Sequence, residues 1–359
     1  MPEAVPLAED ERLSYFSQGM ITIALDTMGA DFSPQNEVSG AVQVIKETGG
    51  GFHILLVGQK EKIEKELQKH SGFPKEAIEI LDASEVITMG DEPVQALRQK
   101  RQSSIVVALE ALKNNKADAF ISAGNTGAVM SGATLELGRI PGVSRPMIGS
   151  QFPRSSGGFT IVFDVGATVD AKPHWMKEYG IMGSIYAKTI FGLENPSVAL
   201  LSVGEEKTKG NELVLESAKL LEQTDLNFVG NVEGRDILNG KVDIILCDGF
   251  TGNILLKLAE SFLPALRMRI KKYSEGGIVN KLKAAITASV LRSSLKDFDY
   301  QEYGGVPLLG VNGVVIIGHG SSSPRAFRTM LLRAEELVKK DLYGSVKNAM
   351  AKEQGKVTQ

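Results

Sequence analysis

The chain has 359 residues, of which 43% are hydrophobic and 23% charged, a composition typical of a soluble globular protein with a large core. Collagen-like, coiled-coil and largely disordered chains are excluded by the same numbers. The 40 Lys and Arg residues against 43 Asp and Glu residues leave a formal net charge of −3, so no overall basic field would draw the chain onto nucleic acid.

Cysteine usage and the lengths of the apolar runs narrow the class further. Cys247 is the one cysteine, so an intramolecular disulfide and a cysteine-built zinc site are both excluded, which is typical of a reducing compartment. No run approaches the roughly 18 uninterrupted apolar residues of a membrane-spanning helix. We therefore expect a cytoplasmic protein.

The predicted elements alternate along the chain in the manner of an α/β fold. Residues 1–19 are polar and acidic without periodicity, and we expect a disordered extension there. From Met20 onward, strands are predicted at residues 21–25, 54–57, 119–121, 160–163, 198–201, 244–246 and 314–317. Helices are predicted at residues 61–69, 103–114, 126–138, 176–191, 212–222 and 324–340. Residues 20–350 are expected to form a single two-lobed domain, with a polar tail at residues 351–359.

Glycine-rich turns with polar neighbours directly follow five of the predicted strands. They are Asp26-Thr-Met-Gly-Ala-Asp31, Ser122-Ala-Gly-Asn-Thr-Gly-Ala128, Asp164-Val-Gly-Ala-Thr168, Ser202-Val-Gly-Glu205 and Asp248-Gly-Phe-Thr-Gly-Asn253. In an open α/β sheet the ligand crevice lies beyond the carboxyl ends of the strands, so these loops are expected to converge and bind an anion through backbone amides. The candidate phosphate-binding residues are Asp26, Gly29, Asp31, Asn125, Thr126, Gly127, Asp164, Asp248, Thr251 and Asn253.

These loops have competing interpretations. Each one alone is more often plain turn geometry, and Asn125 suits a helix cap as well as a phosphate contact. Aspartates at three strand ends suit a divalent metal, although we predict that no metal is bound. The first strand is not followed by Gly-x-Gly-x-x-Gly, and no loop matches a Walker motif, so nucleotide binding by those routes is disfavoured.

Taken in order, these loops and several further motifs resemble the PlsX family, the phosphate acyltransferases of bacterial phospholipid synthesis. The further motifs are Asp91-Glu-Pro93, Lys209-Gly-Asn-Glu212, Asn231-Val-Glu-Gly-Arg235, Cys247 before its Asp-Gly turn, and Gly318-His-Gly-Ser-Ser322. The resemblance runs from Met20 to about Lys340. The chain departs from the family pattern at Thr168, where Asn is usual, and in the first loop, where the family usually has Ala and a second Gly.

The resemblance implies a fold, a reaction and partners. The fold would be a large two-lobed α/β/α sandwich like isocitrate and isopropylmalate dehydrogenases and phosphotransacetylase, usually a homodimer. The reaction would convert acyl-[acyl carrier protein] and inorganic phosphate into acyl phosphate and free carrier protein, with no cofactor. A membrane-bound glycerol-phosphate acyltransferase would consume the product downstream.

Phosphate is itself the nucleophile and a thiolate leaves readily, so the chemistry depends on positioning and on donors to the developing oxyanion. Lys209 matches the family's Lys-Gly-Asn-Glu stretch and is our first choice for the cation that neutralises phosphate or the carbonyl oxygen. Lys207 is its rival. His319 suits either a general acid for the leaving thiolate or a structural role.

Residues 251–296 have the pattern of an amphipathic helical hairpin broken at Gly276-Gly277. A core or dimer-interface hairpin is one interpretation. The other, favoured by the family resemblance, is peripheral attachment to an anionic membrane at the inner face of the cell membrane. The residues predicted to lie on the membrane are Leu263, Leu266, Arg267, Lys271 and Lys272.

Two rival functions are compatible with the same sequence. A phosphotransacetylase-like enzyme would prefer acyl coenzyme A over carrier protein as acyl donor. A non-catalytic carrier-protein or lipid-binding module would bind without forming acyl phosphate.

Overall fold

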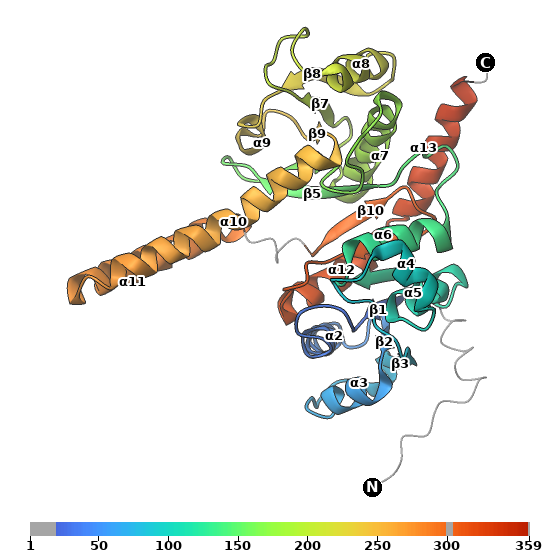
Figure 1. Cartoon of the computed structure of the whole chain (residues 1–359), viewed down its shortest axis with the longest axis vertical. Helices are drawn as coiled ribbons and strands as arrows, with labels where there is room; N and C mark the ends of the chain where they lie inside the picture. Colours follow the sequence, from blue (N-terminus) through green and yellow to red (C-terminus); the bar gives the residue numbers. More distant parts are fainter. Residues whose placement is uncertain (1–18, 299–303, 358–359) are drawn as a thin grey trace.

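The computed structural model describes residues 19–298 and 304–357, and its centre is one continuous mixed sheet (Figure 1). The strands follow one another across the sheet in the order β3 (Ile78–Asp82), β2 (His53–Gly58), β1 (Thr22–Asp26), β4 (Ala119–Ser122), β11 (Val314–Ile317), β10 (Val306–Leu309), β5 (Met147–Pro153), β6 (Phe159–Phe163), β9 (Ile244–Leu246), β7 (Ser197–Leu201) and β8 (Asn227–Val232). The extension expected at residues 1–19 lies, except for Gly19, outside the described residues.

Strand direction reverses in the middle of this sheet. β3, β2, β1, β4 and β11 are mutually parallel and form the first lobe. β10 is antiparallel to both β11 and β5, and β5 is antiparallel to β6. The strands of the second lobe, β6, β9, β7 and β8, are again mutually parallel but run opposite to those of the first. The carboxyl ends of the two parallel sets therefore do not share one edge of the sheet.

Helices cover both faces of the sheet, which makes the predicted three-layer sandwich. Successive strand side chains point to opposite faces, so Ile23 and Leu25 join one apolar cluster and Ala24 the other. In the first lobe the helices are α2 (Gln35–Thr48), α3 (Lys60–Leu67), α4 (Pro93–Gln99), α5 (Ser104–Lys113), α6 (Thr126–Gly132) and α12 (Pro324–Lys339). In the second lobe they are α7 (Pro173–Phe191), α8 (Glu212–Leu221), α9 (Asp236–Asn239) and α13 (Leu342–Val357).

The carboxyl-terminal helix differs from the sequence prediction. Residues 351–357 of the expected polar tail continue α13, because Leu342, Val346 and Met350 recur at four-residue spacing and are buried against the body. α13 packs on α7, where Lys177 and Glu353 form an ion pair of 2.8 Å. α13 thus leads from α12 of the first lobe back to α7 of the second and links the two lobes.

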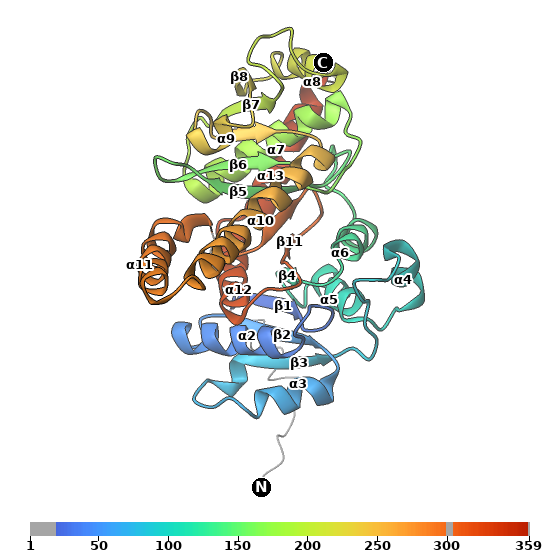
Figure 2. The same cartoon turned by 60° about the vertical axis from the view of Figure 1, so that its left-hand side comes forward.

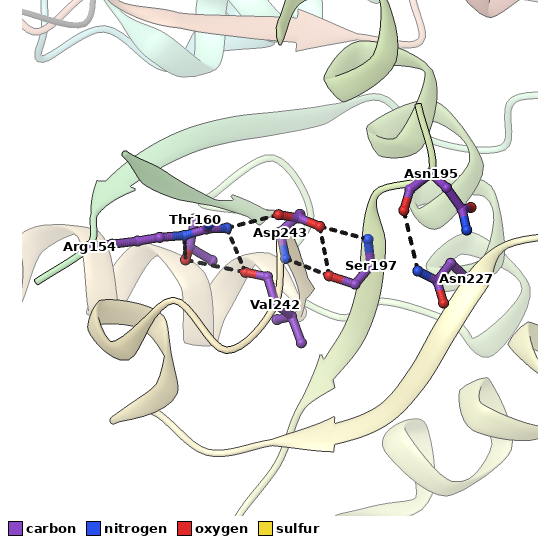
Figure 3. A network of polar contacts seen from close by, with 7 residues as sticks. All are labelled: Arg154, Thr160, Asn195, Ser197, Asn227, Val242 and Asp243. Atoms are coloured by element: carbon purple, nitrogen blue, oxygen red, sulfur yellow. Dashed lines mark hydrogen bonds and ion pairs between the residues drawn. The ribbon is translucent and has the colours of Figure 1, made fainter. Parts of the chain in front are cut away.

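A polar network joins the amino-terminal ends of three strands in the second lobe (Figure 3). The Asp243 carboxylate accepts hydrogen bonds from the amide and hydroxyl of Ser197, and Arg154 donates to its other oxygen at 3.1 Å. Arg154 also donates to the Thr160 hydroxyl and the Val242 carbonyl. Burial alone would raise the pKa of Asp243, but these donors hold it below its usual value. This network lies at the strand ends opposite to the glycine-rich loops and serves to fix the sheet.

The predicted hairpin is present and projects from the body (Figures 1 and 2). It consists of α10 (Gly249–Ser274), which continues through Pro264, and α11 (Ile278–Ser294) packed against it. Large apolar side chains on its outward faces are more than half exposed: Phe250, Ile254, Leu258, Phe262 and Met268 on α10, and Ile278, Leu282 and Ile286 on α11. No helix among the described residues combines the length and hydropathy needed to cross a bilayer.

The structure places the five predicted membrane residues in two environments. Leu263 and Leu266 are partly buried and line the groove between α10 and α11, since they lie on the side of α10 that faces α11. Arg267, Lys271 and Lys272 are exposed, and Arg267 and Lys271 also line this groove. The apolar surface that faces solvent is therefore a different set of residues from the one that the sequence pattern selected.

Candidate active site

The glycine-rich loops form two groups rather than one, because the strand reversal sends the two parallel sets in opposite directions. The first group contains the loops after β1, β4 and β11. There Gly29 lies against Gly124, and the Asp31 amide donates to the Gly320 carbonyl at 2.9 Å. The second group contains the loops after β6, β9 and β7. Convergence of all these loops on one crevice stays a prediction, and the interaction of Glu260 in α10 with His319 relates the two groups.

Asp26 organises the first group from the end of β1. Its carboxylate accepts a hydrogen bond from the Ser122 hydroxyl at 2.6 Å and another from the Met28 amide at 2.9 Å. Ser122 in turn accepts from the Gly124 amide at 3.1 Å, so the loops after β1 and β4 are held together. Burial raises the pKa of Asp26 to about 6, against the opposing effect of these donors.

The side-chain oxygen and the side-chain amide of Asn125 are both hydrogen-bonded within the protein. Its side-chain oxygen accepts from the Ala128 amide at 3.0 Å and caps α6, while its amide group donates to the carbonyls of Thr88 and Asp91 at 3.1 Å each. The side chain thus positions the loop, and the capping interpretation describes its contacts. Thr126 and Gly127 begin α6 directly beside it.

A second buried carboxyl group lies behind the loop after β1, at a position that no motif in the sequence marks. Glu37 of α2 is fully buried; one of its oxygens accepts from the Ser33 hydroxyl, which itself accepts from the Ala30 amide at 3.0 Å. The other oxygen has no hydrogen-bond partner among the described residues. Burial raises the pKa of Glu37 to about 7, and the charge of nearby Asp26 acts in the same direction.

Replacing Glu37 with glutamine is expected to stabilise the protein at pH 8 but not at pH 5. The folded-state pKa of about 7 lies above the ordinary value of 4.5, so the folded state keeps a proton that the unfolded state loses between these values. The free energy of unfolding of the original protein therefore falls as pH rises through that window, by up to about 1.4 kcal/mol per unit of pKa shift. The substituted glutamine side chain does not titrate and escapes this loss.

Thermal unfolding of both proteins at pH 5, 6, 7 and 8 measures the difference. Glu61→Gln, on an exposed position of α3, is the matched control and should leave the pH dependence unchanged. A Glu37→Gln effect of the same size at every pH would contradict the assignment of a raised pKa to this carboxyl group.

His319 lies at the edge of the first group, beside the second. The Ser321 amide donates to His319 Nδ1 at 3.2 Å, and the Ser321 hydroxyl lies 2.8 Å from the same ring nitrogen. Glu260 of α10 is close enough to interact electrostatically with His319; burial raises the pKa of Glu260, and the histidine opposes that rise. α10 begins in the second group of loops, so it links the two groups.

Asp164 organises the second group from the end of β6. One carboxylate oxygen accepts from the amides of Ile148, Gly166 and Ala167 at 2.9–3.2 Å, and the other accepts from the Thr168 amide at 2.7 Å. Burial raises the pKa of Asp164 to about 6, and these amides oppose the rise. Because Thr168 contributes its backbone amide, the departure from the family's Asn does not alter this hydrogen bond.

The loop after β9 interlocks with the loop after β6. Asp248 caps α10, accepting from the amide and hydroxyl of Thr251 at 2.8 and 2.9 Å. A side chain at Gly252 would collide with the Asp164 carbonyl, so glycine is required for this approach. Asn253 lies beside Gly166, whose φ of +139° favours glycine, and its amide makes no hydrogen bond to a described residue. Asn253 is therefore the available polar side chain here, in contrast to Asn125.

The two candidate lysines in the loop after β7 have different contacts. Lys207 forms an ion pair of 2.9 Å with Glu222 at the end of α8. Lys209 is exposed, and its ammonium has no ion-pair or hydrogen-bond partner among the described residues. The Asn231 side chain donates to the carbonyls of Glu206 and Lys209 at 3.0 and 3.2 Å, which fixes this loop. Asn231 stands in a motif that the sequence analysis quoted, but its role depends on a contact between two loops.

The aspartates do not assemble into a metal centre. Asp26 belongs to the first group of loops, whereas Asp164 and Asp248 belong to the second. Within the part of the chain that the structure describes, no three His, Cys, Asp or Glu side chains are grouped in a way that would hold a metal ion.

Relatives of known sequence match nearly the whole chain. A profile of the family described as "Fatty acid synthesis protein" matches residues 21–344. The curated phosphate acyltransferase of Halothermothrix orenii is 44% identical over 333 residues, which cover 92% of this chain and 99% of that protein. The phosphate acyltransferase of Heliobacterium modesticaldum is 46% identical over 324 residues, covering 90% and 96% respectively.

Solved structures support the predicted fold. The EutD phosphotransacetylase from Staphylococcus aureus superposes with a TM-score of 0.55 at 15% sequence identity, covering 95% of this chain and 98% of that one. A 4-hydroxythreonine-4-phosphate dehydrogenase from Klebsiella pneumoniae superposes with a TM-score of 0.52 at 11% identity, covering 89% and 99%. At these identities the likeness concerns the fold alone. By the extent and identity of the sequence matches, the chain belongs to the PlsX family of phosphate acyltransferases.

Proposed function

We propose that this acyltransferase takes its acyl group from the thioester of acyl carrier protein and transfers it to inorganic phosphate. A phosphate oxygen attacks the thioester carbonyl carbon, the carbon–sulfur bond breaks, and the thiolate of the carrier protein leaves and takes up the proton that phosphate gives up. The products are an acyl phosphate and the free thiol. No cofactor enters this balance.

The observation that carries this proposal is the second group of loops. Lys209 and Asn253 are polar side chains without partners among the described residues; Lys209 lies in the loop after β7, and Asn253 lies near the start of α10, which follows the neighbouring parallel strand β9. Cations and amide donors placed in this way suit phosphate and a developing oxyanion. His319 supplies a candidate hydrogen-bond donor to the leaving sulfur, and Glu260 of α10, which interacts with it, connects its loop to the second group.

The decisive assay uses the purified full chain with long-chain acyl-[acyl carrier protein] and inorganic phosphate, and traps the acyl phosphate with hydroxylamine. Hydroxamate that forms only when phosphate is present supports the proposal. Faster turnover with acyl coenzyme A than with the carrier protein would assign the chain a phosphotransacetylase-like donor. Binding of the acyl carrier protein without any hydroxamate would instead make it a binding module.

We also propose that the chain forms a homodimer and attaches peripherally to the inner face of the cell membrane, where a membrane-bound glycerol-phosphate acyltransferase would receive the labile product. The support is the hairpin, whose outward side chains are apolar and more than half exposed while its basic side chains include Arg267, Lys271 and Lys272. Apolar area next to positive charge is the combination that binds anionic lipid surfaces.

Replacing Leu282 with glutamate is expected to abolish sedimentation with anionic liposomes while activity on soluble acyl-[acyl carrier protein] persists. Leu282 is 65% exposed near the tip of the hairpin, so the substitution places a charge against acyl chains. Thr287→Glu, at an exposed position on a different side of α11, adds the same charge and should still sediment. Binding of the original protein should weaken with salt, because exposed charges are screened over about 10 Å at 0.1 M. Normal sedimentation of the Leu282→Glu protein would contradict the proposal that this face of the hairpin binds the membrane.

A further inference from the structure

A groove of about 880 Å³ runs along the inner side of the hairpin, between α10 and α11. Its volume falls in the range of about 300–1,000 Å³ that is usual for small-molecule sites. The groove is distinct from the outward faces of the hairpin, since none of the exposed apolar residues of α10 and α11 named above lines it.

The walls of the groove are apolar along its length. They are formed mainly by Leu263, Leu266 and Ile270 of α10 and by Ala284, Ala288 and Leu291 of α11. Alanines on α11 leave the space that larger side chains would fill. From Leu263 to Ser274 the groove follows α10 for about 17 Å, at about 1.5 Å per residue. An extended, narrow apolar channel of this kind fits a linear hydrocarbon chain better than a compact ring system.

The charged side chains that line the groove are all positive. Lys271 and Lys281 stand toward the tip of the hairpin, Arg267 stands midway, and Lys296 and Arg325 stand at the inner end. No acidic side chain lines the groove among the residues that the structure describes. An anionic group would complement these cations. A ligand with an apolar chain and an anionic head therefore matches both the apolar walls and the basic side chains of the groove.

The inner end of the groove lies next to the His319 loop. Glu260, which interacts with His319, precedes Leu263 by one helical turn of α10. On the other side, Arg325 stands in the first turn of α12, directly after the loop that follows β11. A chain in the groove would therefore have its inner end close to one of the two loop groups of the candidate active site.

We infer that this groove binds one acyl chain of the substrate or product, with the anionic acyl phosphate end near Lys296 and Arg325 and the methyl end toward the hairpin tip. The inference rests on the proposed function for the identity of the head group. The apolar walls contribute affinity for the chain, and the cations contribute affinity for the phosphate.

Alkyl phosphates test the groove directly, because they carry one chain and one phosphate and do not hydrolyse as acyl phosphates do. Decyl, dodecyl and tetradecyl phosphate, each below its micelle-forming concentration, are titrated calorimetrically into the full chain. Affinity is expected to rise about fourfold for each added methylene group that becomes buried. Arg325→Gln is expected to lower affinity for every chain length while the dependence on length stays the same.

Two phenylalanine substitutions locate the binding. Ala288→Phe fills the groove and is expected to lower dodecyl phosphate affinity at least tenfold, whereas Ala265→Phe makes the same change at an exposed position of α10 outside the groove. Ala285→Phe, at an exposed position on the groove wall, provides a second groove variant if Ala288→Phe unfolds the hairpin. Retention of affinity by Ala265→Phe and loss in the groove variants supports the inference.

Three outcomes would overturn it: no alkyl phosphate binding by the original protein, equal effects of the groove and outward substitutions, or a change of oligomeric state in the groove variants. The last would show that a second copy of the chain occupies the groove. The hydroxamate assay separates this inference from the proposed function. Acyl phosphate formation without alkyl phosphate binding would contradict the inference about the groove alone. Alkyl phosphate binding without acyl phosphate formation would contradict the proposed function and leave the groove as a binding site for amphiphiles.

Discussion

Replacing Lys209 with alanine is expected to lower kcat by about a hundredfold or more, which is the usual effect of losing one important donor to a transition-state oxyanion. Lys209 is an exposed cation without a partner among the described residues, on a loop that Asn231 fixes from the neighbouring strand. The substitution removes charge from a surface position, so the melting temperature should be nearly unchanged.

Lys207→Ala is the matched control, since it removes the same charge two residues away in the same loop. Lys207 is bound to Glu222 in an exposed ion pair, and such pairs contribute little to stability. Its loss should leave hydroxamate formation from acyl-[acyl carrier protein] and phosphate close to that of the original protein. If Lys209→Ala turns over normally, or if Lys207→Ala is the more impaired of the two, the assignment of the cation is wrong.

Replacing Asp164 with asparagine is expected to lower both stability and activity. The carboxylate accepts four backbone amides through two oxygens, whereas asparagine offers one oxygen and turns an amide group toward the remaining donor. At least one buried amide then loses its acceptor, at a cost of about 1–3 kcal/mol. The loops after β6 and β9 should loosen together, because Gly249 and Gly252 pack directly on Asp164 and its neighbours.

Thermal unfolding and steady-state kinetics with varied phosphate measure the two effects separately. Asp170→Asn, in the same connection but without a hydrogen bond described for its side chain, is the control and should change neither. An Asp164→Asn protein that melts normally and keeps its KM for phosphate would show that the loop is organised by other contacts.

The motifs determined the family and, with it, the chemistry, because each motif is a short local pattern that needs no partner to be recognised. Apolar runs of four or five residues followed by glycine turns also predicted most of the parallel strands correctly. The strands that the sequence analysis missed have weaker local patterns. β10 contains Pro307, the middle of β5 is Gly149-Ser-Gln151, and β3 and β8 are only partly buried.

Two of these strands, β10 and β5, decided how the loops of the site are grouped. β10 and β5 reverse the direction of the sheet, so loops that look equivalent along the chain are divided between two groups. Strand direction depends on pairing between segments far apart in sequence, and no local pattern encodes it.

The roles of equivalent-looking side chains were decided in the same way. Asn125 and Asn253 both follow glycine turns. The side-chain amide of Asn125 donates to the carbonyls of Thr88 and Asp91, whereas that of Asn253 makes no hydrogen bond to a described residue. Lys207 and Lys209 differ because Glu222, directly after α8, forms an ion pair with the former alone among the described residues. The sequence by itself determined the reaction class, the α/β alternation and the hairpin, all of which follow from residue type and local period. The tertiary structure alone decided which side chains are free to act, because that depends on partners brought together by folding.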